Sequence, residues 1–235
     1  MLQKALELIR TNLMLILVLL ISLVGIFHSA RFALSSLDFY AVKNLISQWQ
    51  ETESVKNTED IARAKSHLER AKALHPAHPV YTDMLGQVFE WGALSGSSNE
   101  IGDLQQAKAL YSAAIQQRPT WPVTYASLIL VKWRLGEFDE ELIESIKMVQ
   151  TLGAKKPEVH AIIIRFGLAT YAENHPFYAH VRDALPKYLS LALRNQETRI
   201  STLAIIDYYQ SLKTVCRWMN KQDPWVVKNA LKCVQ

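Results

Sequence analysis

A continuous apolar run near the N-terminus constrains the fold of this chain more than any other feature. Residues 13–27 read LMLILVLLISLVGIF, and the twenty residues between Arg10 and Arg31 carry no charge. About twenty apolar residues suffice for a helix to cross about 30 Å of hydrocarbon. We therefore expect a transmembrane segment at 11–31, preceded by a short cytoplasmic tail at 1–10.

Two interpretations of this segment compete. A cleavable signal peptide shares the basic flank and the apolar run, but it needs small residues at positions −3 and −1 of the cleavage site. For cleavage after Ala30, position −3 is His28, and the acceptable triplet at 33–35 lies late in the segment. The long run and the poor cleavage site favour a retained signal anchor over a cleaved peptide.

The charges that flank the run favour one orientation slightly. Lys4 and Arg10 precede the run, whereas Arg31 and then Lys43 follow it. Because short cytoplasmic segments are enriched in basic residues, the tail is expected in the cytoplasm and the body on the other side.

The two cysteines, Cys216 and Cys233, bear on the compartment of the body. An even pair suits a disulfide in an oxidising compartment, and two free thiols are the alternative. Together with the charge bias, the pair favours a bacterial inner-membrane protein whose body is periplasmic.

The composition of the body favours helices. Among 235 residues there are only eight glycines and eight prolines, and 49% of the chain is hydrophobic. Leu37, Leu45 and Trp49 recur at helical spacing, which predicts an amphipathic linker helix at 32–58. The net charge is +4, and the body alone is nearly balanced, so no nucleic-acid partner is expected.

One pattern of packing residues occurs twice in the body. It places a large residue between two small ones at helical spacing and ends in proline. Small residues let two helices approach closely, the large residue fills the gap between them, and proline ends the helix. The first copy is Ala64, Leu68, Ala71 and Pro76, and the second, 43 residues later, is Ala107, Tyr111, Ala114 and Pro119.

Together with Leu85, Gly86 and Phe89, this pattern resembles the tetratricopeptide repeat, W-x2-L-G-x2-Y…A-x3-F-x2-A-x4-P over about 34 residues. The resemblance implies an all-α fold, with a tetratricopeptide-like array of helical hairpins at 59–173 and a C-terminal helical cap at 174–235. An unrelated helical bundle is the alternative.

The repeats depart from the consensus in two places. About nine extra residues around ALSGSSNEI separate the two helices of the repeat that begins near Pro79. In the next repeat, Glu141, Ser145 and Met148 stand at the three packing positions. This substitution puts the third packing layer in doubt, although the segment is still expected to be helical.

A narrower resemblance covers residues 64–170. The stretches HPVYTDMLGQVFEW and AKALYSAAIQQRPTWPVTYASLILVKWRLGEFD, behind an N-terminal anchor, resemble proteins of bacterial exopolysaccharide gene clusters, the VpsP type; the most specific piece is RPTWP at 118–122. The resemblance implies a scaffold or adaptor in polysaccharide biosynthesis or export. Its partners would be other proteins of that machinery, and it supplies no active site.

Ligands of tetratricopeptide arrays usually lie along the concave face formed by the first helix of each repeat. Trp91, Trp121 and Trp133 surround the two best repeats and are expected mainly as packing residues, with stacking on sugar rings as the alternative. Carried onto this chain, the resemblance implies a partner-binding groove lined by Asp83, Gln87, Glu90, Ala126, Leu130 and Trp133.

No catalytic or metal motif is visible in the sequence. His75 and His78 flank a helix-ending proline and have no third ligand nearby, so they indicate a turn and not a metal site. We expect that the protein binds no cofactor and is not an enzyme. Two rival functions are kept: a glycan-acting enzyme, which needs two converging carboxylates of perturbed pKa, and an assembly factor of a pilus or secretion system.

Overall fold

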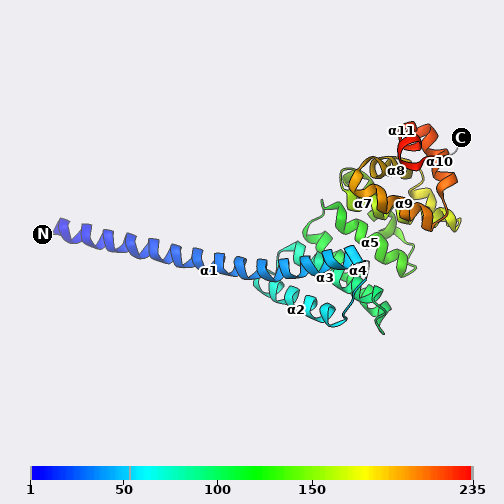
Figure 1. Ribbon diagram of the computed structural model, residues 1–235. Coiled ribbons are helices and arrows are strands. Elements are labelled where there is room, and N and C mark those ends of the chain that lie inside the picture. The colour runs from blue at the N-terminus through cyan, green and yellow to red at the C-terminus, as the bar shows by residue number, and fades with distance from the viewer. Residues whose placement is uncertain (1, 53, 234–235) are drawn as a thin grey trace. The chain divides into compact units, whose positions relative to one another are not determined.

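The computed structural model describes residues 2–52 and 54–233, with side chains from residue 12 onward. Within these residues every regular element is a helix and there is no strand (Figure 1). The prediction of an all-α fold is confirmed. Lys4 and Arg10, the charges of the predicted tail, lie outside the described side chains.

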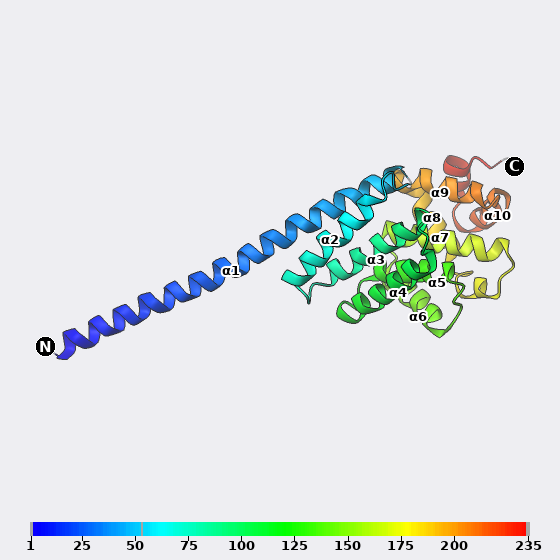
Figure 2. The same ribbon diagram turned by 90° about the horizontal axis from the view of Figure 1, so that it is seen from below.

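The N-terminal helix contains the whole apolar run. α1 (Leu2–Thr52) is one continuous helix of 51 residues (Figure 1, Figure 2). Its most apolar 18-residue window has a mean hydropathy of 2.6, and none of that window is buried. α1 is therefore long and apolar enough to cross a membrane, as the sequence predicts. Its length of about 75 Å exceeds the roughly 30 Å of a hydrocarbon core.

The chain divides into two compact units, residues 1–81 and 82–235. In the first unit, the second half of α1 packs against α2 (Glu59–Leu74). Residues 32–52 are thus helical, as predicted for the linker at 32–58, but they form half of a hairpin and are not a separate linker. The buried apolar residues of this hairpin are Val42, Ile46 and Trp49 of α1 and Ile61, Ala64, Leu68 and Ala71 of α2.

Polar contacts also join α1 to α2. Asp38 accepts hydrogen bonds from His67 at 2.6 Å and from Arg70 at 2.8 Å. Burial alone would raise the pKa of Asp38, but these two partners hold that pKa below its ordinary value. Arg31 donates to the carbonyl of Leu74, which leaves a basic side chain at the end of α2, where the helix dipole favours it.

The second unit contains a stack of helical hairpins. α5 packs against both α4 and α6, and it also packs against α7, the next helix in the position of a first repeat helix. This is the tetratricopeptide-like arrangement that the repeat pattern predicts. The helices are α3 (Pro79–Leu94), which begins in the first unit, α4 (Glu100–Gln117), α5 (Pro122–Arg134), α6 (Glu140–Leu152) and α7 (Pro157–Ala172).

The predicted packing residues of the repeat lie in the core. Ala107, Tyr111 and Ala114 of α4 are all buried. Gly86 of α3 faces Tyr111 so closely that a Cβ atom there would lie 2.7 Å from its ring, hence only glycine fits. The extra residues between α3 and α4 mostly lengthen these two helices and leave a short turn at 95–99.

The third packing layer forms with a shifted register. Of the residues at the consensus positions, Ser145 is buried, whereas Glu141 is exposed and Met148 is only partly buried. The rest of the buried face of α6 consists of Leu142, Ile146 and Val149. Each of these follows a consensus position by one residue, so α6 packs through a neighbouring side of the helix.

The C-terminal segment is built from short helices. They are η1 (Pro176–His180), α8 (Leu185–Arg194), α9 (Gln196–Tyr208), α10 (Leu212–Gln222), α11 (Pro224–Val226) and η2 (Val227–Leu231). The segment 198–221 is divided between α9 and α10 and is not one long helix. Gln210 has a φ of 50°, a left-handed conformation that ends a helix, so the chain turns between α9 and α10.

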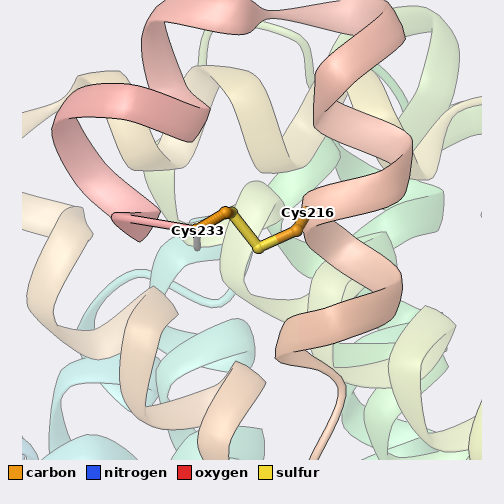
Figure 3. The surroundings of a disulfide bond; sticks show 2 residues. All are labelled: Cys216 and Cys233. Carbon is orange, nitrogen blue, oxygen red and sulfur yellow. A yellow bond between two sulfur atoms is a disulfide. The ribbon is translucent and has the colours of Figure 1, made fainter. Parts of the chain in front are cut away.

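A disulfide joins Cys216 of α10 to Cys233, just after η2 (Figure 3). The two Cα atoms lie 6.0 Å apart and the residues are 17 apart in sequence. Nearby, the carboxylate of Asp223 accepts from the Arg194 guanidinium at 2.6 and 2.8 Å and from the Ser190 hydroxyl at 2.5 Å. The last helices are therefore fixed by one covalent bond and one ion pair.

Candidate functional site

Three of the predicted groove residues lie along one side of α3. Asp83, Gln87 and Glu90 follow one another at helical spacing, which places them on one face. All three are partly exposed, and the Gln87 amide donates to Asp83 Oδ2 at 3.0 Å. We call these three residues the polar row.

Two hydrogen bonds connect the polar row to α5. The Thr124 hydroxyl donates to Asp83 Oδ1 at 2.6 Å, and Arg134 donates to Glu90 Oε1 at 2.8 Å. The partners are 41 and 44 residues apart in sequence. Offsets of nearly equal size at both ends mean that α3 and α5 run parallel, one repeat apart. This agrees with the 43-residue shift of the packing pattern.

α4 supplies a third connection, which the sequence did not reveal. The Tyr111 hydroxyl donates to Glu90 Oε2 at 2.9 Å. Burial and the neighbouring carboxylates raise the pKa of Tyr111 well above its ordinary value, so the hydroxyl stays protonated as a donor. The repeat pattern assigned this position to packing. The available signal was a tyrosine where the consensus has phenylalanine.

The pKa values of both carboxylates of the polar row, Asp83 and Glu90, are raised. Burial raises the pKa of Asp83, despite hydrogen bonds from Thr124 and Gln87. Burial also raises the pKa of Glu90, and this effect outweighs the opposing charge of Arg134. Because a raised carboxyl pKa means that the charged form is disfavoured by folding, both acids are held in an unfavourable environment.

The groove residues that were predicted on α5 do not continue the exposed surface of the polar row. Ala126 is completely buried in the hydrophobic core, so the prediction that it contacts a partner is wrong. The physical reason is that α4, α6 and α7 all pack around α5. Trp133 is partly buried, with its ring edge-on to Phe166 at 5.9 Å. Leu130 is partly exposed and remains available.

A second group of side chains lies at the beginning of α5. The Arg118 guanidinium lies 3.8 Å from the ring centroid of Trp121, and the Lys156 ammonium lies 4.3 Å from it. Neither cation forms an ion pair in the part of the chain that the structure describes. The charge of Arg118 acts against the rise that burial causes in the pKa of Asp83, so this group adjoins the polar row. We call it the cationic corner.

A buried lysine was also missed by the sequence analysis. Lys132 is 1% exposed, and its ammonium contacts Glu137 at 3.2 Å, Asp139 at 2.8 Å and Glu141 at 2.7 Å. Burial works to lower the pKa of Lys132, but the three carboxylates together raise it. Such a satisfied ion cluster holds the turn between α5 and α6. Glu141 therefore has a structural partner.

The predicted turn with two histidines has aromatic neighbours. His75 lies edge-on to Phe32 at 4.8 Å, and His78 stacks on Tyr81 at 4.5 Å. Within the described residues, no group of three or more His, Cys, Asp or Glu side chains is arranged to hold a metal ion.

Comparison with protein families and with curated proteins identifies no relative: the chain matches no protein-family model and no curated protein. The function is therefore inferred from the sequence patterns and from the geometry of the polar row and the cationic corner.

Proposed function

We propose that this protein is a membrane-anchored adaptor of bacterial exopolysaccharide biosynthesis or export. The polar row and the cationic corner, together called the α3–α5 face, would hold another protein of that machinery. The anchor is α1, which is long and apolar enough to span a membrane. Helical-repeat arrays commonly present extended binding surfaces. The pathway itself is supported by the VpsP-type resemblance of residues 64–170.

The polar row carries this proposal. Its side chains are already fixed by α4 and α5 through Tyr111, Thr124 and Arg134. A surface that is ordered before binding loses little conformational entropy when a partner arrives. Acids held at raised pKa values also mark functional surfaces more often than ordinary ones. The partner would supply hydrogen-bond donors to the polar row and an acidic group to the cationic corner.

Two features support a periplasmic body. The positive tail favours a cytoplasmic N-terminus, and the disulfide between Cys216 and Cys233 is typical of an oxidising compartment. On this basis we propose that the anchor lies in the inner membrane and the body in the periplasm.

The test is affinity capture of the full-length protein from membranes of its native host, followed by mass spectrometry. Gln87→Arg adds bulk and charge to the polar row while keeping a donor for Asp83. Gln106→Arg makes the same change at an exposed position of α4 and is the control. We expect glycosyltransferases, polymerases or export proteins with the wild type and the control, and their loss with Gln87→Arg.

Other outcomes would change the conclusion. Capture of pilus or secretion components would replace the pathway while keeping the adaptor role. Full retention of every partner by Gln87→Arg would exclude the α3–α5 face as the binding surface.

One observation favours a second candidate, a glycan-acting enzyme. Asp83 and Glu90 are two neighbouring carboxylates with raised pKa values, as an acid catalyst requires. Both are already engaged by protein donors, which favours the adaptor. Incubation of the purified protein with the host polysaccharide distinguishes the two. Chain cleavage that disappears in Glu90→Gln would establish the enzyme, and unchanged chain length would exclude it.

A further inference from the structure

The part of α1 beyond the apolar run has two distinct sides. One side faces α2 and buries Ser35, Val42, Ile46 and Trp49. The opposite side has no neighbour among the described residues of the first unit, yet it is rich in apolar residues. Leu37 is 69% exposed and Tyr40 is 56% exposed. An adjoining set of large exposed apolar side chains on a folded unit indicates a contact surface.

The spacing of these residues identifies the shape of the partner. Ala30, Ala33, Leu37, Tyr40 and Asn44 are separated by alternating steps of three and four residues, and all five are exposed. This is the spacing of the core positions of a heptad repeat, in which a helix meets another helix. We call these five residues the α1 stripe.

The α1 stripe continues into the apolar run. Its period reaches Ile16, Leu19, Leu23 and Ile26, each exposed. Inside the run nearly every residue is apolar, so the spacing there carries no information. Beyond Arg31 the spacing does carry information, because that segment also contains polar residues that fall outside the stripe. They are Ser35, Ser36, Asp38 and Lys43. The stripe is therefore a continuous seam from the membrane-spanning part of α1 to the α1–α2 hairpin.

We propose that α1 pairs with α1 of a second copy of this chain, parallel and in register. Two copies that cross one bilayer in the same orientation can only meet in parallel. In this arrangement Asn44 faces Asn44 of the second copy, and a buried Asn pair at this core position favours parallel dimers of fixed register. Ala30 and Ala33 let the two backbones approach closely where the helix leaves the apolar run.

The charges beside the stripe permit this pairing. The flanking positions hold Leu34, Ser36, Ala41, Lys43 and Gln48. In a parallel pair Lys43 lies opposite Gln48 of the other copy, so no like charges meet. The acid of this segment, Asp38, is occupied by His67 and Arg70 on the α2 side. The stripe can be covered without disturbing the hairpin.

Disulfide cross-linking of the full-length protein in native membranes tests the pairing. The two native cysteines are already joined to each other, so a single introduced cysteine reports on its own position. Leu37→Cys and Asn44→Cys place a thiol on the stripe. Phe32→Cys places one at a residue that is 52% exposed but off the stripe. We expect dimers under mild oxidation with the first two and little with the third.

A second variant keeps the proposal falsifiable if oxidation is inefficient. Leu37→Lys leaves the buried side of α1 unchanged, and single-molecule photobleaching in vesicles should show a shift from two copies to one. Equal cross-linking at all three positions, or single copies of the wild type, would overturn the pairing. Quenching of a probe at residue 37 by lipid-borne quenchers, without cross-linking, would instead assign the stripe to the lipid headgroup region.

Discussion

Both the C-terminal helices and the α3–α5 face contain carboxylates bound by other side chains, but the two environments shift the pKa values of these carboxylates in opposite directions. Hydrogen bonds from Arg194 lower the pKa of Asp223 to about 2, whereas burial raises the pKa of Asp83 and of Glu90. A lowered carboxyl pKa means that folding favours the charge, and a raised one means that folding opposes it. The C-terminal acid therefore stabilises the fold, while the acids of the polar row cost stability. That difference is expected where one region is structural and the other is used for binding.

The largest change in the free energy of unfolding is expected when the disulfide of the C-terminal helices is removed. Replacing both Cys216 and Cys233 by serine removes a cross-link between residues 17 apart in sequence, which contributes about 3 kcal/mol through the unfolded chain. Urea unfolding of the detergent-solubilised protein, followed by circular dichroism, measures the change. Reductant should destabilise the wild type by the same amount and leave the double variant unaffected. A smaller effect, below about 1 kcal/mol, would show that the helices hold the C-terminal end without the bond.

The next largest effect is expected at Asp223, whose contribution to the free energy of unfolding depends on pH. Its pKa is lowered in the folded state, so its contribution is present above the unfolded pKa of about 3.9 and is lost as pH falls toward about 2. Asp223→Asn should cost about 2 kcal/mol at neutral pH and flatten the stability profile between about pH 4 and pH 2. Unfolding curves across that range test this. Asp183→Asn, at an exposed ion pair, is the control and should change little.

A smaller effect is expected where the polar row meets α4. Tyr111→Phe removes the hydroxyl that donates to Glu90 and leaves the buried ring in place. The loss of one buried hydrogen bond costs about 1 kcal/mol, because Arg134 still pairs with Glu90. Thermal unfolding compared with Tyr208→Phe, at a residue that is 79% exposed, gives the difference. No change would mean that water replaces the hydroxyl as a donor.

These regions also differ in how far the sequence could predict them. The membrane-length helix, the paired repeats and the nearby cysteines depend on short-range spacing, which sequence reveals directly. Which side of α5 is exposed could not be predicted, because that depends on the packing of α7 against α5. Ala126 is buried in the core that α5 shares with α6 and α7, and the packing positions of α6 depart from the repeat consensus.

Single residues account for the other differences. Gln210 adopts a left-handed conformation in a segment whose apolar spacing continues unbroken, so the pattern gave no sign of the turn. Lys132 stands where the repeat has an aromatic residue, and its three partners come from the following turn and the first turn of α6. Sequence spacing shows that acids are near a lysine along the chain, but only the fold shows that the lysine is buried.

The smallest effect on stability is also the one that separates the two regions most clearly. Asp83 has a raised pKa in the folded state, so folding is favoured as pH falls through that pKa and penalised above it. Asp83→Asn removes the penalty and keeps an oxygen for Thr124. At neutral pH the free energy of unfolding should stay constant or rise by up to about 1 kcal/mol, while partner capture falls. Glu100→Gln, at the exposed start of α4, should change neither. If Asp83→Asn instead destabilises the protein as Asp223→Asn does, the polar row is structural, and the proposed binding surface loses its main support.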